Sequence, residues 1–255
     1  MSTLLQEILD HGGINVFYQP IFEIVDGKPV LFAVEALSRG PKGSNAEKPD
    51  VLFEYVRRKA KEVEVDRACV KAILSSMYMV ARRALVSINV HALTLERDDQ
   101  FTQYLTELCQ LFRIPLKNVI MEIVEQQRYR NPARFFSNLD LLRKAGVRIA
   151  VDDIGLGYSN YRALVEIKPD LFKIDRYFVT GCGKNAHARA AIESIVLLAD
   201  RLGGRVVAEG IESADDLEAV TALGVRLVQG YHLALPQPVQ TLNAVSPRNA
   251  QEVCE

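Results

Sequence analysis

The fold is decided by the stretch VFYQPIFEIVDGKPVLFAVEAL, residues 16–37. It contains two apolar, strand-like runs, 16–24 and 30–37, with Asp26-Gly27 between them. An Asp-Gly pair between two such runs favours the tight turn of a β-hairpin. The sequence therefore predicts that the first two strands are antiparallel.

A strand-then-helix rhythm follows this hairpin. After a polar loop at 38–49, helical patterns cover 50–83, 98–112, 131–145, 160–167, 186–202 and 214–223. Strands are expected at 85–90, 118–124, 148–152, 171–175, 205–209 and 226–229, nearly all as continuous apolar runs, which is typical of strands covered on both faces. Gly146, Gly203 and Gly224 follow three of the helices, where a left-handed C-cap is expected.

With the hairpin, these runs make eight strands interleaved with helices in a chain of 255 residues. The pattern favours an α/β fold, a modified TIM (β/α)8 barrel with an antiparallel first strand; an open doubly wound sheet is the alternative. No linker or repeat marks a second unit. We therefore expect one domain over residues 1–255, with a core at about 14–238 and a partly loose tail from Gln237 onward.

Composition narrows the class of protein. The chain is 49% hydrophobic and 25% charged with a net charge of −1, which indicates a globular protein without the field that recruits DNA, RNA or a membrane surface. Its four cysteines form no CxxC pair, as expected of reduced thiols in the cytoplasm. No apolar run approaches the roughly 18 residues of a membrane span, and residues 1–11 lack the features of a signal peptide. We expect a cytoplasmic protein. No sensor or receiver domain accompanies the barrel in this sequence, which is either a free-standing enzyme or a fragment of a larger protein.

One polar or charged side chain stands near the end of each of seven apolar runs: Glu35, Asn89, Glu122, Asp152, Lys173, Glu209 and Gln229. In a parallel barrel the strand ends converge on one face, which is where enzymes of this architecture have their active site. Burying such a group without a partner costs roughly 2 to 7 kcal/mol. These side chains are therefore expected to be exposed, paired or bound to metal.

The oxygen donors of this set predict a site for divalent cations. Glu35, Asn89, Glu122 and Asp152 are hard ligands of the kind that Mg²⁺ and Mn²⁺ prefer, and Asp153 follows Asp152 directly. Adjacent carboxylates can bridge two ions about 3.5 to 4 Å apart, which suits in-line displacement at phosphorus. Any one of these residues alone is more often a helix cap, an ion-pair partner or a solvated residue, so their combination carries the prediction.

Two of the candidate residues have alternative roles. Lys173 either orients a nucleophilic water or forms a structural ion pair with Asp175 or Asp152. Glu209 is either a general base or a ligand of a second ion. The glycines of segment 155–157 predict a mobile loop over the metal site rather than a dinucleotide fingerprint, because Asn160 stands at the third glycine position.

Glu35-Ala36-Leu37 with Arg39 resembles the signature of the EAL domain family, bacterial phosphodiesterases that hydrolyse cyclic di-GMP to linear pGpG. The resemblance runs from about Val16 to Pro236 and includes segments 18–21, 88–90, 122–125, 152–155, 173–175, 208–212 and 229–231. It implies a modified TIM barrel with an antiparallel first strand. It also implies Mg²⁺ or Mn²⁺ as cofactor, with two ions, inhibition by Ca²⁺, and a homodimer.

By position, the resemblance also implies roles for individual residues. Glu35, Asn89, Glu122 and Asp152 resemble the ligands of one metal ion, and Asp152 with Asp153 those of the second. Lys173 and Glu209 resemble the pair that positions and activates the water. Substrate contacts are implied for Gln19, Glu35, Leu37, Arg39 and Gln229, and Glu125 resembles the glutamate that braces the loop after Asp153. Val124, Ile154, Leu156 and Gly40 depart from the family's usual residues, Thr, Phe, Thr and Trp, which bears on the loop and the purine pocket rather than on the reaction type.

The sequence thus predicts a metal-dependent phosphodiesterase that converts cyclic di-GMP to pGpG by in-line attack of an activated water. One alternative is a receptor module that binds cyclic di-GMP without useful turnover. Another is a barrel hydrolase that acts on a different phosphodiester.

Overall fold

The computed structural model describes residues 4–10, 12–77, 84–124, 129–155 and 161–242. Eight strands form a closed barrel in chain order. They are β1 (Asn15–Val25), β2 (Lys28–Arg39), β3 (Leu85–His91), β4 (Val119–Val124), β5 (Arg148–Ile154), β6 (Leu171–Ile174), β7 (Arg205–Ala208) and β8 (Leu227–Val228). The barrel prediction is confirmed, and the open-sheet alternative is wrong.

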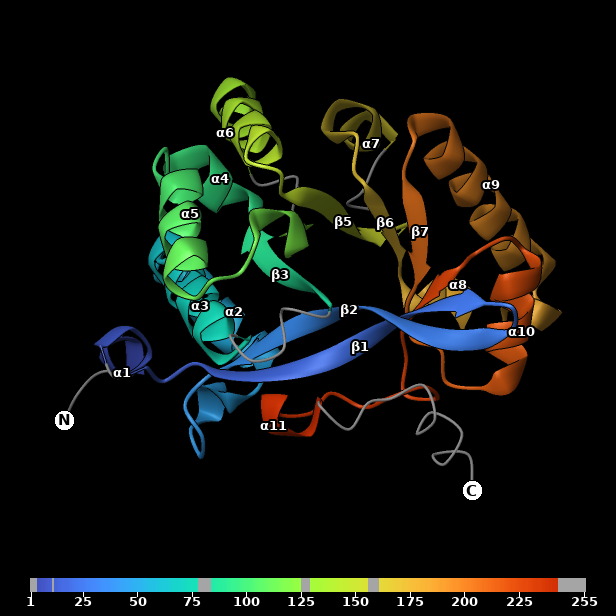
Figure 1. Ribbon diagram of the computed structural model, residues 1–255, viewed down its shortest axis with the longest axis horizontal. Coiled ribbons are helices and arrows are strands. Elements are labelled where there is room, and N and C mark those ends of the chain that lie inside the picture. Colours follow the sequence, from blue (N-terminus) through green and yellow to red (C-terminus); the bar gives the residue numbers. More distant parts are fainter. Residues whose placement is uncertain (1–3, 11, 78–83, 125–128, 156–160, 243–255) are drawn as a thin grey trace.

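The first strand runs against both of its neighbours. β1 pairs antiparallel with β2, from Asn15 opposite Arg39 to Val25 opposite Lys28, and antiparallel with β8. The six remaining neighbouring pairs are parallel. At the hairpin turn Asp26 and Gly27 have φ of 51° and 73°, as the tight turn requires. Figure 1 shows this long hairpin in blue, lying across one side of the barrel.

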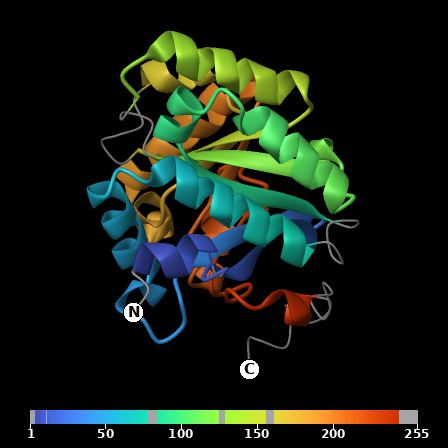
Figure 2. The same ribbon diagram turned by 90° about the vertical axis from the view of Figure 1, so that its left-hand side faces the viewer.

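Helices surround the strands on the outside, as Figures 1 and 2 show. They are α1 (Leu4–Asp10), α2 (Pro49–Arg58), α3 (Glu62–Met77), α4 (Ala92–Arg97), α5 (Phe101–Leu111), α6 (Pro132–Lys144), α7 (Tyr161–Ile167), α8 (Arg176–Val179), α9 (Ala186–Leu202), α10 (Ala214–Ala222) and α11 (Val239–Leu242). The sequence did not predict α1, α4, α8 or α11. Short 3-10 turns lie at η1 (Asn45–Glu47), η2 (Leu116–Asn118) and η4 (Cys182–Lys184). In the described ranges no helix combines the length and apolarity needed to cross a bilayer.

Local sequence signals set the ends of several helices. Side chains of Asn131, Asn185 and Ser213 accept backbone hydrogen bonds at the starts of α6, α9 and α10, which satisfies otherwise unpaired N–H groups. Gly146, Gly203 and Gly224 follow helices with φ of 90°, 77° and 91°. The predicted left-handed caps are confirmed.

The first residues of the tail that was predicted to be partly loose are attached to the barrel. Backbone hydrogen bonds of 2.7 and 3.0 Å join Gln237 to Tyr18 on β1, and α11 follows with Leu242 buried. The chain is therefore attached to the barrel through residue 242, because the outer edge of β1 offers unpaired backbone groups at Tyr18. Residues 243–255 lie outside the described ranges.

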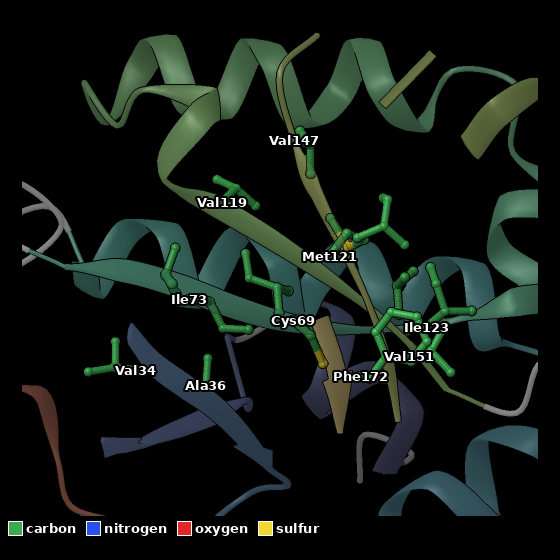
Figure 3. Close-up of a cluster of buried hydrophobic side chains, with 14 of the residues drawn as sticks. Val34, Ala36, Cys69, Ile73, Val119, Met121, Ile123, Val147, Val151 and Phe172 are labelled. Carbon is green, nitrogen blue, oxygen red and sulfur yellow. The ribbon is translucent and has the colours of Figure 1, made fainter. Parts of the chain in front are cut away.

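The apolar core has two layers. One fills the barrel interior with Ile21, Ala33, Ile120, Ala150, Leu171, Val207 and Leu227. The other lies between strands and helices, and Figure 3 shows part of it, including Val34 and Ala36 on β2 and Cys69 and Ile73 on α3. Because successive side chains of a strand point to opposite faces, Glu35, between Val34 and Ala36, points into the barrel. The strands thereby aim polar side chains at one interior region above the apolar layer.

Candidate active site

Four carboxylates surround one lysine at the C-terminal ends of the parallel strands. The Nζ atom of Lys173 lies 2.5 Å from Glu122 Oε1, 2.6 Å from Glu209 Oε1, 3.4 Å from Glu35 Oε2 and 3.6 Å from Asp152 Oδ1. These groups come from β2, β4, β5 and β6 and from the residue after β7. We call Glu35, Glu122, Asp152 and Glu209 the carboxylate ring. The structure thus brings together five of the seven polar residues that the sequence singled out.

The other two, Asn89 and Gln229, hold Glu35 in place. Gln229 Nε2 donates to Glu35 Oε2 at 2.7 Å, and Asn89 Nδ2 donates to Glu35 Oε1 at 3.1 Å. Burial acts to raise the pKa of Glu35, but the Lys173 ammonium and these hydrogen bonds outweigh it, so the pKa is lowered. Glu35 is therefore ionised and fixed in orientation.

Glu122 and Glu209 experience the opposite balance. Glu122 is completely buried, and burial is the main cause that raises its pKa well above the ordinary value; the rest of the ring adds to this and Lys173 opposes it. Burial also raises the pKa of Glu209, with the same opposing influence. Burial acts to lower the pKa of Lys173, but the surrounding carboxylates raise it well above its usual range. One ammonium ion is thus firmly charged and does not neutralise the ring.

Ser87 is a member of the site that the sequence analysis missed. Its Oγ donates to Glu122 Oε2 at 2.9 Å, and its side chain is buried. Ser87 precedes Asn89 by two residues on β3, so both side chains lie on the same face of that strand. That spacing was the available signal, but a serine within an apolar run is too common to be singled out.

A β-bulge near the end of β5 shapes the Asp152-Asp153 pair. Val151 pairs with Phe172 and Ile154 pairs with Ile174, so β5 has one residue more than β6 between these two points. Asp153 takes the left-handed conformation, with φ of 53°. Partial desolvation, with the nearby charges of Asp152 and Asp175, raises the pKa of Asp153 to about 6, although part of the side chain stays exposed. The bulge therefore keeps two consecutive carboxylates near each other at one end of the barrel.

A cavity of about 210 Å³ opens above the ring. It is lined by Gln19, Glu35, Asp152, Lys173, Asp175, Arg176, Glu209, Gly210, Glu212, Gln229, Gly230 and Tyr231. Gln19 is buried there, and its Nε2 donates to the carbonyl of Ala234 at 3.2 Å. The sequence analysis did not single out Arg176 or Tyr231 as site residues. Arg176 directly follows segment 173–175, and Tyr231 is the last residue of segment 229–231, for which the family resemblance implied no role at this position.

Two other predicted substrate contacts lie farther along the hairpin. Leu37 and Arg39 follow Glu35 on β2 by two and four residues, so by strand alternation they share its face. The guanidinium carbon of Arg39 lies 5.1 Å from the centre of the Phe17 ring. Arg39 and Phe17 line a separate cavity of about 670 Å³ beside α1 and α3, and Leu37 does not. The 210 Å³ cavity is therefore not lined by Arg39.

The structure separates the alternatives for Lys173 in part. Asp175 accepts a hydrogen bond from the Tyr177 N–H at 2.7 Å and so caps α8. Lys173 instead contacts the four ring carboxylates. The predicted ion pair between Lys173 and Asp175 is therefore wrong. The predicted contact between Lys173 and Asp152 is confirmed, and it is the longest of the four contacts. Glu125 and the predicted loop glycine at 157 fall outside the described residues.

The donor chemistry of these residues fits a divalent cation. The ring offers hard oxygen ligands in excess of the one ammonium charge, and Gln229 Oε1 is buried without a hydrogen-bond partner among the described residues. As they stand, the described His, Cys, Asp and Glu side chains form no metal-ligating group of three or more. Lys173 Nζ occupies the space between Glu122 and Glu209. An incoming cation would compete with this ammonium for the same oxygens.

Comparison with known proteins gives a consistent family. Residues 2–236 match the EAL domain family. The cyclic di-GMP phosphodiesterase RocR of Pseudomonas aeruginosa is 32% identical over 240 residues, which cover 91% of this chain and 59% of RocR. The cyclic di-GMP phosphodiesterase PdeF of Escherichia coli is 30% identical over 254 residues, which cover 97% of this chain and 33% of PdeF. The chain thus spans less than two thirds of either relative.

A solved structure shows the same fold. Klebsiella pneumoniae BlrP1, in a complex with manganese and cyclic di-GMP at pH 9.0, superimposes with a TM-score of 0.79 at 24% identity, covering 88% of this chain and 56% of BlrP1. That level of identity establishes the barrel architecture alone. Because the family match extends over nearly the whole sequence, this chain belongs to the EAL domain family.

Proposed function

We propose that this chain hydrolyses cyclic di-GMP to linear pGpG with two divalent cations, Mg²⁺ or Mn²⁺. The observation that carries the proposal is the carboxylate ring around Lys173 at the mouth of an EAL-family barrel. The names of the relatives RocR and PdeF, both cyclic di-GMP phosphodiesterases, support the choice of substrate.

The charge of the cavity supports a need for metal. Five carboxylates line it, from Glu35, Asp152, Asp175, Glu209 and Glu212, against two cationic side chains, Lys173 and Arg176. Cyclic di-GMP carries two phosphates and is an anion. Like charges in a partly desolvated cavity repel strongly, so an anionic substrate needs additional positive charge there.

The ligand assignment follows the sequence prediction. Glu35, Asn89, Glu122 and Asp152 would hold the first ion, and Asp152 with Asp153 the second. When bound, such ions lower the pKa of water and offset the charge of the phosphate. The hydrogen bonds from Gln229 and Asn89 hold Glu35 in one orientation before any ion arrives.

The protein's own groups handle the proton. Glu209, whose pKa is raised by burial, is suited to accept a proton from the attacking water at a carboxylate oxygen. Lys173 Nζ, 2.6 Å from Glu209 Oε1, orients that carboxylate. A new bond forms between the water oxygen and phosphorus, the bond from phosphorus to one ribose 3′-oxygen breaks, and that oxygen takes a proton from solvent. The product is pGpG.

The test is direct. Purified protein is incubated with cyclic di-GMP and Mg²⁺ or Mn²⁺, with an EDTA control, and the products are separated by chromatography. We expect pGpG only where the metal is present. Binding of cyclic di-GMP without pGpG would support the receptor alternative, and turnover of other cyclic or linear dinucleotides alone would indicate a different phosphodiester substrate.

Three further expectations stay predictions. They are a single domain over residues 1–255, a cytoplasmic location and a homodimer. Light scattering on the purified protein measures the mass in solution and so tests the dimer.

A further inference from the structure

Glu122 is the most deeply buried carboxylate of the ring, and each of its two oxygens has its own partner. Lys173 Nζ lies 2.5 Å from Oε1, and Ser87 Oγ donates to Oε2 at 2.9 Å. Glu122 is 0% exposed and Ser87 is 1% exposed, so bulk water does not compete with this hydrogen bond. The two oxygens therefore differ, because one faces the ammonium ion and the other is tied to β3.

The register of the barrel places Ser87 directly beneath the ring. Asn89 lies opposite Glu122 in the pairing of β3 with β4, and Ser87 lies opposite Ile120, two residues earlier on each strand. Ile120 belongs to the apolar layer that fills the barrel interior. Strand residues two apart share a face, so all four side chains point into the barrel. Ser87 thus puts a hydroxyl donor between the apolar layer and the ring.

Ser87 and Lys173 hold the carboxyl group of Glu122 from two sides, which fixes its rotation. A cation that takes the place of the ammonium ion meets Oε1, the oxygen that Lys173 contacts. To offer Oε2 as well, the carboxyl group has to turn, and the turn weakens the hydrogen bond from Ser87. Losing a hydrogen bond in a buried region is unfavourable, because the hydroxyl left behind has no water to pair with. The bond from Ser87 therefore favours ligation through one oxygen.

The number of oxygens that a carboxylate offers distinguishes Mg²⁺ from Ca²⁺. Mg²⁺ demands near-octahedral geometry with oxygens at about 2.0 to 2.1 Å. Ca²⁺ accepts about six to eight oxygens at about 2.3 to 2.6 Å, and it takes a carboxylate through one oxygen or through both. A carboxylate that is held so as to offer one oxygen suits the octahedral ion. The same carboxylate, once free to turn, suits the larger ion better.

Resting on the proposed function, we propose that Ser87 is a positioning residue that sets the cation preference of the first metal site. Its hydroxyl keeps Glu122 as a ligand through Oε1 and so favours Mg²⁺ over Ca²⁺. Ser87 touches neither the cation nor the substrate and acts through Glu122. Removing a hydrogen-bond partner of a metal ligand typically lowers metal affinity by about 10- to 100-fold.

The test measures dissociation constants of Mg²⁺ and Ca²⁺ by calorimetry, without substrate, in the wild type and in Ser87→Ala. We expect the constant for Mg²⁺ to rise about tenfold in the variant. The constant for Ca²⁺ should change by less than about twofold, because Glu122 can then turn and offer Ca²⁺ both oxygens. Ser87→Thr keeps the hydroxyl and should keep the wild-type ratio of the two constants.

A matched control separates this role from a general loss of structure, which would weaken both cations alike and leave their ratio unchanged. Ser213 Oγ donates to the buried carboxylate of Asp216 at 2.7 Å, outside the carboxylate ring. Ser213→Ala therefore removes the same kind of hydrogen bond at another place. We expect the ratio of the Mg²⁺ and Ca²⁺ constants in Ser213→Ala to equal that of the wild type.

The outcomes separate the two proposals. A wild type that binds neither cation and forms no pGpG would overturn the proposed function and this role of Ser87 with it. A wild type that forms pGpG, with the same ratio of constants in Ser87→Ala, would overturn the role of Ser87 alone. If the melting curve shows that Ser87→Ala does not fold, Ser87→Cys takes its place, because a thiol fills the space and is a weak donor. An unchanged ratio in Ser87→Cys would then overturn the role in the same way.

Discussion

Replacing Lys173 with Met tests the electrostatic account of the site in the metal-free protein. Lys173 is 2% exposed and carries the one positive charge among the four carboxylates of the ring. Methionine has a similar length and fills the same space, so the substitution leaves no large cavity and loses little stability through packing. What the substitution removes is the charge, and the ring carboxylates are then left to repel one another.

Two independent estimates of the unfolding free energy lost in Lys173→Met agree. Removing one partner of a buried ion pair costs about 3 to 5 kcal/mol. Alternatively, one ring carboxylate takes up a proton; at pH 7, for a group with an unfolded pKa near 4.3, this costs about 3.7 kcal/mol. We expect Lys173→Met to lose about 4 kcal/mol of unfolding free energy at pH 7. For a chain of this size, that loss lowers Tm by roughly 8 to 16 °C.

The pH dependence has a definite sign. The native variant holds a proton that the unfolded chain releases above about pH 4.3, so its stability falls as pH rises. Relative to wild type, the loss of about 4 kcal/mol at pH 7 should shrink to about 2 kcal/mol at pH 5.5. Urea unfolding of the variant and the wild type in EDTA at both pH values measures this difference in unfolding free energy.

Two controls sharpen this test. Lys184→Met changes an exposed lysine of η4 and should cost less than about 0.5 kcal/mol. The double variant Lys173→Met with Glu122→Gln removes a charge from each side and should recover part of the lost stability. A loss below about 1 kcal/mol at pH 7, or a loss that does not change with pH, would refute the reasoning.

Three further substitutions test other parts of the site. Glu35→Ala should abolish Mn²⁺ binding in calorimetry and pGpG formation together; hydrolysis at the wild-type rate would contradict the ligand assignment. Asp153→Asn should stabilise the metal-free protein by up to about 1 kcal/mol at pH 8, a value discounted for the exposure of this side chain. Because the pKa of Asp153 is raised to about 6, that gain should disappear as pH falls below about 4, and urea unfolding across this range would show a constant gain if the assignment is wrong. Gly210→Ala should lower the free energy of unfolding by about 1 to 3 kcal/mol, since the φ of Gly210 is 66° and a Cβ there would collide with Arg176. A melting temperature equal to that of wild type would argue against this close packing.

The strands of the barrel were predictable because their signals are local. A strand that is covered on both faces reads as a continuous apolar run, and Asp26-Gly27 marks the one antiparallel turn. α4 was missed for the opposite reason. It spans six residues, too few for a periodic pattern, and the carboxylate that accepts hydrogen bonds at its start, Asp66, lies on α3: it accepts the His91 N–H at 2.9 Å and the Thr94 hydroxyl at 2.5 Å.

The candidate site, too, was predictable from the sequence only in part. The seven polar residues near strand ends could be read from the sequence, because each stands out against its own apolar run. Which carboxylates surround Lys173 could not, since Glu122 and Glu209 are 51 and 36 residues away in the chain and meet only when the barrel closes. Asp175, two residues from Lys173, was the natural partner by sequence, but its side chain caps α8 instead.

By itself, then, the sequence determined the residue types of the site, the order of the strands, and the antiparallel start. The tertiary structure alone decided the partners of Lys173, the role of Ser87, the attachment of Gln237 to β1 and the placement of Arg176 and Tyr231 beside the cavity. The physical reason is that backbone periodicity acts over a few residues, whereas hydrogen bonds and charge pairs depend on distances that only barrel closure sets.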